Sequence, residues 1–389
     1  MDQSVKLRAG AAADRLELLE SLIAGEAAAA AECLGKDWFV GRVLSEATEE
    51  GKDPKVPIST HSLVLESSNE KRVKLMISEC AEYLVYAGQI LGAVGTLNKD
   101  EFHAIQLVTA PVPDLPPTTQ ALTTSHLLVA SGPYSPDSML LFDSLAELEV
   151  QVRAEAPDVL VLMGPLLDAG HPVVASGTVQ DSFGRASTFE AVYTEEIFPK
   201  LSRLARACET AKTRLLIVPA VNEARFDFPL PQPPINTSTN PLWTALVKEL
   251  PASVQFCSNP VSVELGGTHL LISSTDALSS LNSSLLFKQA PEGSGRVETC
   301  LREMLSARTL FPLMPSAVRI DPARRSALDF STMPSVVISP SLSGRRFVKT
   351  VAGRTFVNPG FLSDATGTTS SLAKIVLAPN GVSAEILKL

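Results

Sequence analysis

Three short apolar runs, each ending in a turn, constrain the fold of this chain more than any other feature. The runs cover residues 127–130, 159–163 and 215–218, and Gly or Pro follows each of them within two residues. Runs of this length bounded by Gly or Pro are typical of buried strands in a parallel sheet. Because the sites of open α/β sheets lie at the carboxyl ends of the strands, the three turns are predicted to share one edge.

Two longer segments separate these runs and complete the pattern of a layered α/β domain. Residues 138–155 and 188–210 are predicted to be helices that cover the sheet. After a proline-rich loop at 226–234 the pattern changes to shorter strands, and the chain ends in a predicted hairpin with Asn380-Gly381 at its turn. The short strands are expected at 261–265, 269–273, 335–339, 346–351 and 355–357.

The segment before this domain carries an all-β pattern. Apolar and charged residues alternate over Arg72–Ile77, which indicates a half-buried strand. About five such strands within 38–108 are typical of a small Greek-key barrel of the OB type. The strands are expected near 38–44, 62–65, 72–77, 88–95 and 102–108.

A helix and a linker flank the predicted barrel. Asp14–Ala24 is predicted to be an amphipathic helix that Asp14 caps and Gly25 ends, and the Ala-rich stretch to Ala31 extends or resumes it. Pro111–Pro117 is the clearest linker, because its prolines exclude helix and central strand alike. A chain of 389 residues exceeds one compact core. We therefore predict a helical segment (1–32), an OB-fold domain with the proline linker at its end (33–116), and an α/β domain (117–389).

The charge balance argues against a protein that holds nucleic acid by itself. Acidic residues outnumber basic ones 42 to 33, and the net charge is −9, whereas backbone binding needs Lys and Arg to neutralise phosphates. An OB barrel can bind single-stranded DNA through aromatic residues in a basic groove. The aromatic residues here are expected mostly to pack inside the barrel; they are Trp38, Phe39, Tyr83, Tyr86 and Phe102.

The cysteines and the hydropathy pattern predict a reducing, intracellular compartment. The five cysteines lie far apart and never form a Cys-x-x-Cys pair, so they predict neither a local zinc knuckle nor a disulfide framework. We expect reduced thiols packed as small apolar side chains. No signal peptide and no membrane-spanning apolar run is recognisable.

Over residues 125–389 the chain resembles the calcineurin-like metallophosphoesterases. Working members place Asp-x-His after the first strand and Gly-Asp-x-x-Asp after the second, followed by Gly-Asn-His-Asp/Glu and Gly-His-x-His turns. Two metal ions need such carboxylates and imidazoles to activate a water. In this chain the corresponding positions hold Ser131, Pro133, Pro165, Asp168, Asn222 and Ser341.

This substitution pattern predicts a site without metal or cofactor. Among the motif positions only Asp168 has a charged side chain that could ligate a metal, and a lone carboxylate is more often a turn or cap acceptor. His171, which follows the second turn, is expected to be a solvated loop histidine. The resemblance therefore implies an inactive phosphoesterase domain with no catalytic residues.

An OB barrel, a proline linker and a metal-free phosphoesterase domain together resemble the B subunits of the replicative DNA polymerases, most closely those of DNA polymerase alpha–primase. Members usually carry a separate helical domain and a long linker before the barrel, so contacts of that domain cannot be transferred to residues 1–32. The motifs that carry the resemblance include Phe39-Val40-Gly41-Arg42, Ser131-Gly132-Pro133-Tyr134, Gly164-Pro165-Leu166-Leu167-Asp168-Ala169, Ser274-Thr275-Asp276, Phe311-Pro312-Leu313 and Val357-Asn358-Pro359-Gly360.

The resemblance implies a non-catalytic scaffold subunit in the nucleus. Such a protein would bind the zinc-containing C-terminal domain of the polymerase alpha catalytic subunit and help join it to the primase subunits for initiation of DNA replication. DNA contact would be weak or indirect, and no membrane would be involved. Two alternatives remain open: an active metallophosphoesterase with relocated ligands, and a single-stranded DNA-binding module acting through the OB domain.

Overall fold

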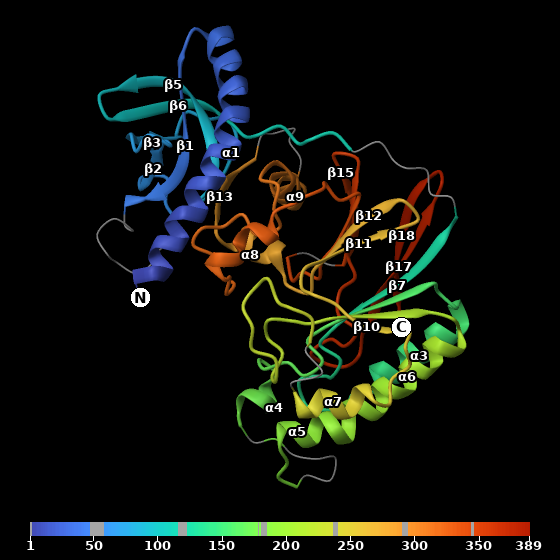
Figure 1. Ribbon diagram of the computed structural model, residues 1–389. Helices are drawn as coiled ribbons and strands as arrows, with labels where there is room; N and C mark the ends of the chain where they lie inside the picture. Colours follow the sequence, from blue (N-terminus) through green and yellow to red (C-terminus); the bar gives the residue numbers. More distant parts are fainter. Residues whose placement is uncertain are drawn as a thin grey trace. The chain divides into compact units, whose positions relative to one another are not determined.

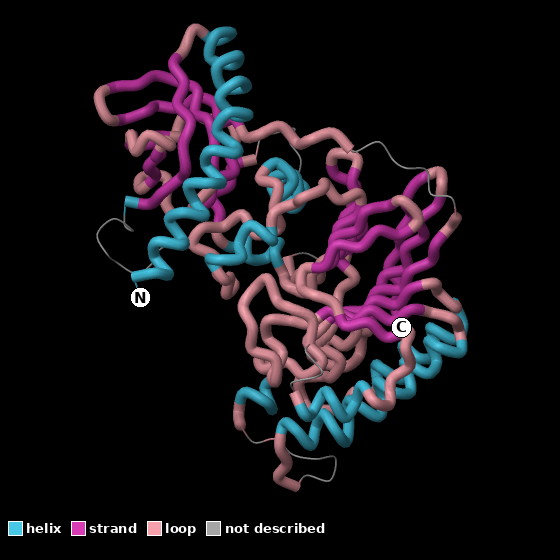
Figure 2. Tube along the Cα trace, viewed as in Figure 1, coloured by secondary structure: helices cyan, strands magenta, loops and turns pink. Residues whose placement is uncertain are grey.

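A computed structural model of the chain describes residues 2–46, 58–115, 123–177, 179, 185–235, 240–289, 295–343 and 346–389. The chain forms two compact units (Figures 1 and 2). We call Met1–Asp114 with Ala277–Met333 the barrel unit, and Leu115–Asp276 with Pro334–Leu389 the sandwich unit. Pro116 and Pro117 of the predicted linker lie outside the described residues. No helix within the described ranges combines the length and apolar character needed to cross a lipid bilayer.

The barrel unit contains the predicted five-stranded barrel. The barrel is closed, β3 and β6 pair in parallel, and alternate residues such as Val43, Leu65 and Leu75 fill its interior. Phe102 is buried in this core, and Phe39 and Tyr83 pack against it, as expected for most of the aromatic residues, whereas Trp38 is 45% exposed. In spatial order the strands are β1 (Asp37–Ser45), β2 (Leu63–Glu66), β3 (Arg72–Met76), β6 (Glu101–Val108) and β5 (Ile90–Asn98).

One continuous helix, α1 (Asp2–Leu34), packs on this barrel. The predicted start at Asp14 and stop at Gly25 are wrong, whereas the predicted extension through the Ala-rich stretch to Ala31 is confirmed. Its buried face contains Leu19, Ile23, Ala27 and Ala31, one residue per helical turn. The helix lies so close to β5 that a Cβ on Gly92 would stand 3.0 Å from side-chain atoms of Ile23 and Ala27. A glycine inside a helix costs only about 1 kcal/mol, so packing of the following turns carries the helix through Gly25.

Residues Ala277–Met333 belong to the barrel unit, which differs from the predicted domain 117–389. Here β4 (Tyr83–Tyr86) pairs antiparallel with β13 (Leu285–Lys288). The Tyr86 hydroxyl and the Gln89 amide also donate hydrogen bonds to the buried Glu303 carboxylate, at 2.8 and 3.1 Å. The periodicity of apolar residues predicts strands but not which strands pair, so these contacts could not be predicted from the sequence pattern. The same segment contains α8 (Ala277–Ser283), α9 (Arg296–Ser306) and the 3-10 helix η2 (Pro322–Leu328).

The sandwich unit is built on a six-stranded sheet that contains the three predicted buried strands. They are the parallel neighbours β7 (Ser125–Ser131), β8 (Val159–Met163) and β9 (Arg214–Val218). The short strand β10 (Val254–Phe256) extends the sheet beyond β9, and the predicted C-terminal hairpin is added beside β7. The hairpin consists of β17 (Ser371–Ala378) and β18 (Gly381–Lys388).

A second, five-stranded sheet packs against this one. Its order is β11 (Val261–Leu265), β12 (Thr268–Ile272), β14 (Val336–Ile338), β16 (Arg354–Asn358) and β15 (Phe347–Val351), which confirms the predicted shorter strands.

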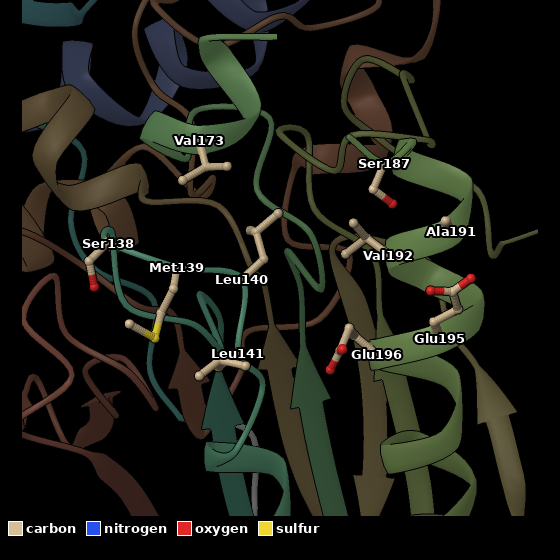
Figure 3. Close-up of a pocket in the computed structure, with 10 residues that line it drawn as sticks. All are labelled: Ser138, Met139, Leu140, Leu141, Val173, Ser187, Ala191, Val192, Glu195 and Glu196. Carbon is tan, nitrogen blue, oxygen red and sulfur yellow. The ribbon is translucent and has the colours of Figure 1, made fainter. Parts of the chain in front are cut away.

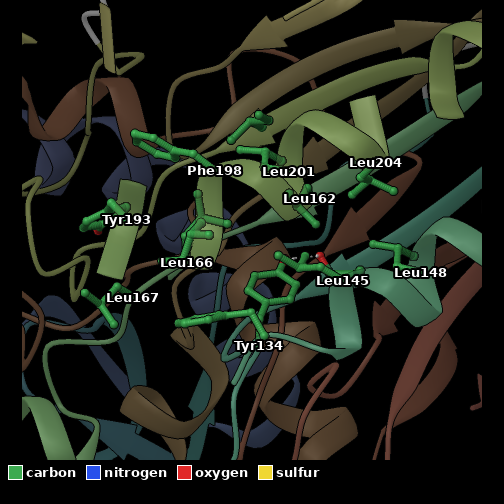
Figure 4. Close-up of a cluster of buried hydrophobic side chains, with 14 of the residues drawn as sticks. Tyr134, Leu145, Leu148, Leu162, Leu166, Leu167, Tyr193, Phe198, Leu201 and Leu204 are labelled. Carbon is green, nitrogen blue, oxygen red and sulfur yellow. Dashed lines mark hydrogen bonds between the residues drawn. The ribbon is translucent and has the colours of Figure 1, made fainter. Parts of the chain in front are cut away.

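Alternation along the central strands separates two apolar layers. Val129 and Val161 face the core between the sheets, whereas Leu128 and Leu160 face the helices on the other side. The covering helices lie along one face of the six-stranded sheet (Figure 1) and supply side chains such as Leu145 and Leu201 to the cluster in Figure 4. They are α3 (Ser144–Glu155), α6 (Phe198–Thr210) and α7 (Pro241–Val247).

Helix boundaries depart from the predicted ones at two points. Helix α3 begins at Ser144 instead of 138, and the preceding loop buries Leu140 and Phe142. The predicted helix 188–210 consists of α5 (Phe189–Ala191), the π-helix η1 (Val192–Ile197) and α6. Pro199 accounts for η1, since it has no N–H to donate to the Glu195 carbonyl one α-turn earlier.

The cysteines are free thiols, and the expected core packing is confirmed for all but one of them. Cys33 is exposed on α1, whereas the other four are buried. Burial raises the pKa of Cys208 and of Cys300 to about 12, which keeps both as neutral thiols at physiological pH.

Candidate functional site

The turns after β7, β8 and β9 meet at the carboxyl edge of the six-stranded sheet, as the sequence predicted. The Gly132 N–H donates to the Met163 carbonyl at 2.9 Å, and the Gly164 N–H donates to the Val218 carbonyl at 2.8 Å. The first two turns therefore extend the backbone hydrogen bonding between β7 and β8 and between β8 and β9 by one residue. We call these three turns, with the turns after β14 and β16, the degenerate edge.

Backbone fills the space between neighbouring turns of the degenerate edge. A Cβ on Gly132 would lie 2.1 Å from the Pro165 carbonyl oxygen, and a Cβ on Gly164 would lie 3.0 Å from the Ala220 backbone nitrogen. At Gly132 only a residue without a side chain permits this approach, whereas the contact at Gly164 is tight. The buried Tyr134 hydroxyl fastens the first turn further by donating to the Met163 carbonyl at 2.7 Å.

Asp168, the charged residue among the motif positions, is an acceptor within a turn. Its Oδ1 accepts hydrogen bonds from the Gly170 N–H and the Asn222 side-chain amide, both at 2.8 Å. The same two segments are joined by backbone hydrogen bonds from Ala169 to Asn222 and from Ala224 to Leu167. The carboxylate therefore holds the second turn against the third.

Glu223 is the buried carboxylate of the degenerate edge, and the sequence reasoning missed it. It is 4% exposed and accepts hydrogen bonds from the backbone N–H groups of Leu166 at 2.7 Å and Leu167 at 2.9 Å, and from the Tyr193 hydroxyl. The side chains of Leu166, Leu167 and Tyr193 are labelled in Figure 4. An acidic residue so close to the end of a buried strand was the available signal.

Burial raises the pKa of Glu223 to about 7, and the nearby Asp168 acts in the same direction. The hydrogen bonds from Tyr193, Leu167 and Leu166 oppose this shift, since each favours the charged form. The side chain therefore titrates near neutral pH while it holds the second turn in place.

The polar side chains at or beside the remaining motif positions also form hydrogen bonds with backbone groups. Ser131 is fully buried, and its hydroxyl donates to the Gly132 carbonyl at 3.2 Å. Asn358 binds the turn of Ser341, accepting from its N–H at 3.1 Å and donating to its carbonyl at 2.9 Å. Pro133 and Pro165 have no ligating side-chain atoms.

His171 is buried, so the expectation of a solvated histidine is wrong. Its Nδ1 accepts a hydrogen bond from the Val173 N–H at 3.2 Å, and its Nε2 lies 2.9 Å from the Pro136 carbonyl. Because a carbonyl only accepts, this arrangement fits the neutral tautomer with the proton on Nε2. The Nδ1 contact lies at the start of α4 (Pro172–Ala175), where His171 is the N-cap, and the Nε2 contact joins this turn to the loop that contains Pro136.

The chemistry open to the degenerate edge follows from these contacts. Within the described residues, no three His, Cys, Asp or Glu side chains gather into a group that could hold a metal ion. A two-metal hydrolase needs several ligands that converge on ions ~3.5–4 Å apart. The contacts here hold the turns in a defined shape.

The family model for the B subunit of DNA polymerases alpha and epsilon matches residues 127–349. The DNA polymerase alpha B subunit of Mus musculus is 28% identical over an alignment of 331 residues that covers 80% of this chain and 51% of the relative. The Schizosaccharomyces pombe protein of the same name is 26% identical over an alignment of 366 residues that covers 87% of this chain and 59% of the relative. The chain thus spans little more than half the length of these relatives.

Two solved structures are similar to part of the chain. An archaeal phosphodiesterase aligns with a TM-score of 0.33 and 10% identity, covering 68% of this chain and 99% of that structure. Chaetomium thermophilum Vps29 aligns with a TM-score of 0.30 and 13% identity, covering 68% and 97%.

Proposed function

The chain belongs to the B-subunit family of DNA polymerases alpha and epsilon, and we propose that it acts as the non-catalytic accessory subunit of a DNA polymerase alpha–primase complex. The proposal concerns association instead of hydrolysis. It rests above all on Glu223. This buried carboxylate of the degenerate edge accepts three hydrogen bonds from the chain itself, so it serves the fold and not a metal ion or a substrate. The relatives among the polymerase alpha B subunits support the replication complex as its setting.

The proposed partner is the C-terminal domain of the polymerase alpha catalytic subunit, with the primase subunits held through the complex. In this role the protein works in the nucleus at the initiation of replication. The net charge of −9 supports weak or indirect DNA contact, since few phosphates can be neutralised by a chain with excess acid.

Co-expression with the polymerase alpha catalytic subunit of the same organism tests the proposal. We expect the two chains to co-elute in size-exclusion chromatography at moderate salt, and we expect deletion of the catalytic subunit's C-terminal domain to abolish co-elution. Independent elution of the full-length partners would contradict the proposal.

Asp168→Ala separates the scaffold function from a hydrolytic one. We expect unchanged co-elution and a loss of about 1 kcal/mol in unfolding free energy, because only the partly exposed acceptor of Gly170 and Asn222 is removed. Chromatography and urea unfolding measure the two effects. Stoichiometric manganese or zinc in the purified wild type, with phosphodiester hydrolysis that Asp168→Ala abolishes, would favour the active metallophosphoesterase.

A further inference from the structure

The sandwich unit contains a cavity of about 240 Å³ on the helix side of the sheet (Figure 3). The loop before α3 contributes Leu140 and Leu141, α4 contributes Val173, and η1 contributes Val192 to an apolar wall. Met139 also lines the cavity and is 47% exposed. An unbranched, polarisable side chain at this place adapts to the shape of an occupant.

Two glutamates of η1 make one side of the cavity acidic (Figure 3). The Glu196 carboxylate is 3.3 Å from the Lys200 ammonium group, which is equally distant from Asp143. The described residues include no ion-pair partner for Glu195, which is exposed. One lysine among these carboxylates leaves an excess of negative charge beside the apolar wall.

The backbone of η1 presents both glutamates to the cavity. The Phe198 N–H donates to the Tyr193 carbonyl, five residues earlier, and the adjacent Pro199 has no N–H to donate to the Glu195 carbonyl. The resulting wide turn contains Glu195 and Glu196 as adjacent lining residues. The π-helical turn therefore lies at the acidic side of the cavity.

The size and lining of the cavity indicate the kind of occupant. Small-molecule and cofactor sites usually measure about 300–1,000 Å³, so this cavity is small for them. It suits one large apolar side chain, and the acidic side favours a cation next to that side chain. A lipid surface is disfavoured, because anionic headgroups would be repelled by the glutamates.

We propose that this cavity docks a partner-protein segment that inserts one large apolar side chain and places a Lys or Arg against Glu195 and Glu196. The inference rests on the proposed function, because it requires a protein partner, and it specifies the chemistry of one contact.

Synthetic peptides test the proposal with the full chain. Fluorescent 15-residue peptides tiling the polymerase alpha catalytic subunit and both primase subunits would be titrated by anisotropy. We expect binding peptides to carry an apolar residue close to Lys or Arg in sequence. Glu195→Lys should weaken their affinity at least tenfold, since it replaces attraction by repulsion at the cavity.

Matched variants distinguish the charge from the cavity. Glu190→Lys makes the same charge change at an exposed position outside the lining and should leave affinity within twofold of the wild type. Ala191→Phe fills the cavity without a charge change and should weaken the same peptides. Thermal unfolding of each variant excludes misfolding as the cause.

Two outcomes overturn the proposal. If no peptide binds, or if Glu195→Lys weakens binding no more than Glu190→Lys, the cavity is not the docking site, whereas co-elution with the catalytic subunit would leave the accessory function standing. If the full chain also fails to co-elute with the catalytic subunit, the proposed function itself fails and the inference with it.

Discussion

Glu223→Ala should lower the free energy of unfolding by about 3–5 kcal/mol, the largest effect expected of a single side chain at the degenerate edge. The substitution leaves the N–H groups of Leu166 and Leu167 and the Tyr193 hydroxyl without their acceptor in a buried place. Each unsatisfied donor costs about 1–3 kcal/mol, and the removed carboxyl also leaves a cavity.

Urea unfolding of the wild type and two controls measures this loss. Asp168→Ala removes a neighbouring carboxylate that is partly exposed and should cost only about 1 kcal/mol. Glu223→Gln keeps the side-chain shape and one acceptor oxygen, so its cost should fall between the two. A Glu223→Ala variant as stable as Asp168→Ala would show that the buried hydrogen bonds do not hold the turn.

The same residue should make stability depend on pH. Burial raises the pKa of Glu223 from 4.5 to about 7, so the folded chain binds more protons than the unfolded chain between these values. The contribution of Glu223 is therefore greatest below its unfolded pKa and declines as pH rises to about 7. Unfolding free energies of wild type minus Glu223→Gln should fall from about pH 5 to about pH 8, and parallel profiles would contradict the raised pKa.

Gly132→Ala should destabilise the sandwich unit by at least about 3 kcal/mol. The added Cβ would lie 2.1 Å from the Pro165 carbonyl oxygen and 3.0 Å from the Pro165 nitrogen. These are backbone atoms that no rotamer change can move, so the first and second turns must separate. Loss of the Gly132–Met163 hydrogen bond would follow.

Gly170→Ala is the matched control for Gly132→Ala. Its Cβ would meet the Asp168 Oδ1 at 3.3 Å, a side-chain atom that can shift by rotation, so we expect a cost below about 1 kcal/mol. Urea or thermal unfolding compares the pair. Equal stability of the two variants would mean that the turns tolerate separation and that their close backbone contact is not required.

The strands of the degenerate edge were predictable because their signal is local. Residues 159–163 are all apolar, and a buried parallel strand requires that on both faces. The turns could be assigned to one edge because parallel strands end at the same side of a sheet. The absence of ligating side chains at Pro133 and Pro165 was likewise readable from residue type alone.

Features that depend on a distant partner were not predictable in this way. The sequence left open whether the helix continues through Gly25 or resumes after it, and only the packing of Ala27 and Ala31 in the barrel unit shows why it continues. The pairing of β4 with β13 moved a whole segment into the barrel unit.

The sequence alone determined which residues form the buried strands, because apolar periodicity is a property of the local chain. The tertiary structure alone decided what the polar groups of the edge do. Glu223 is a structural acceptor because the Leu166, Leu167 and Tyr193 donors reach it from other segments. The energy of a buried polar group depends on which hydrogen-bond partners surround it in the folded protein, and the order of residues along the chain does not specify those partners.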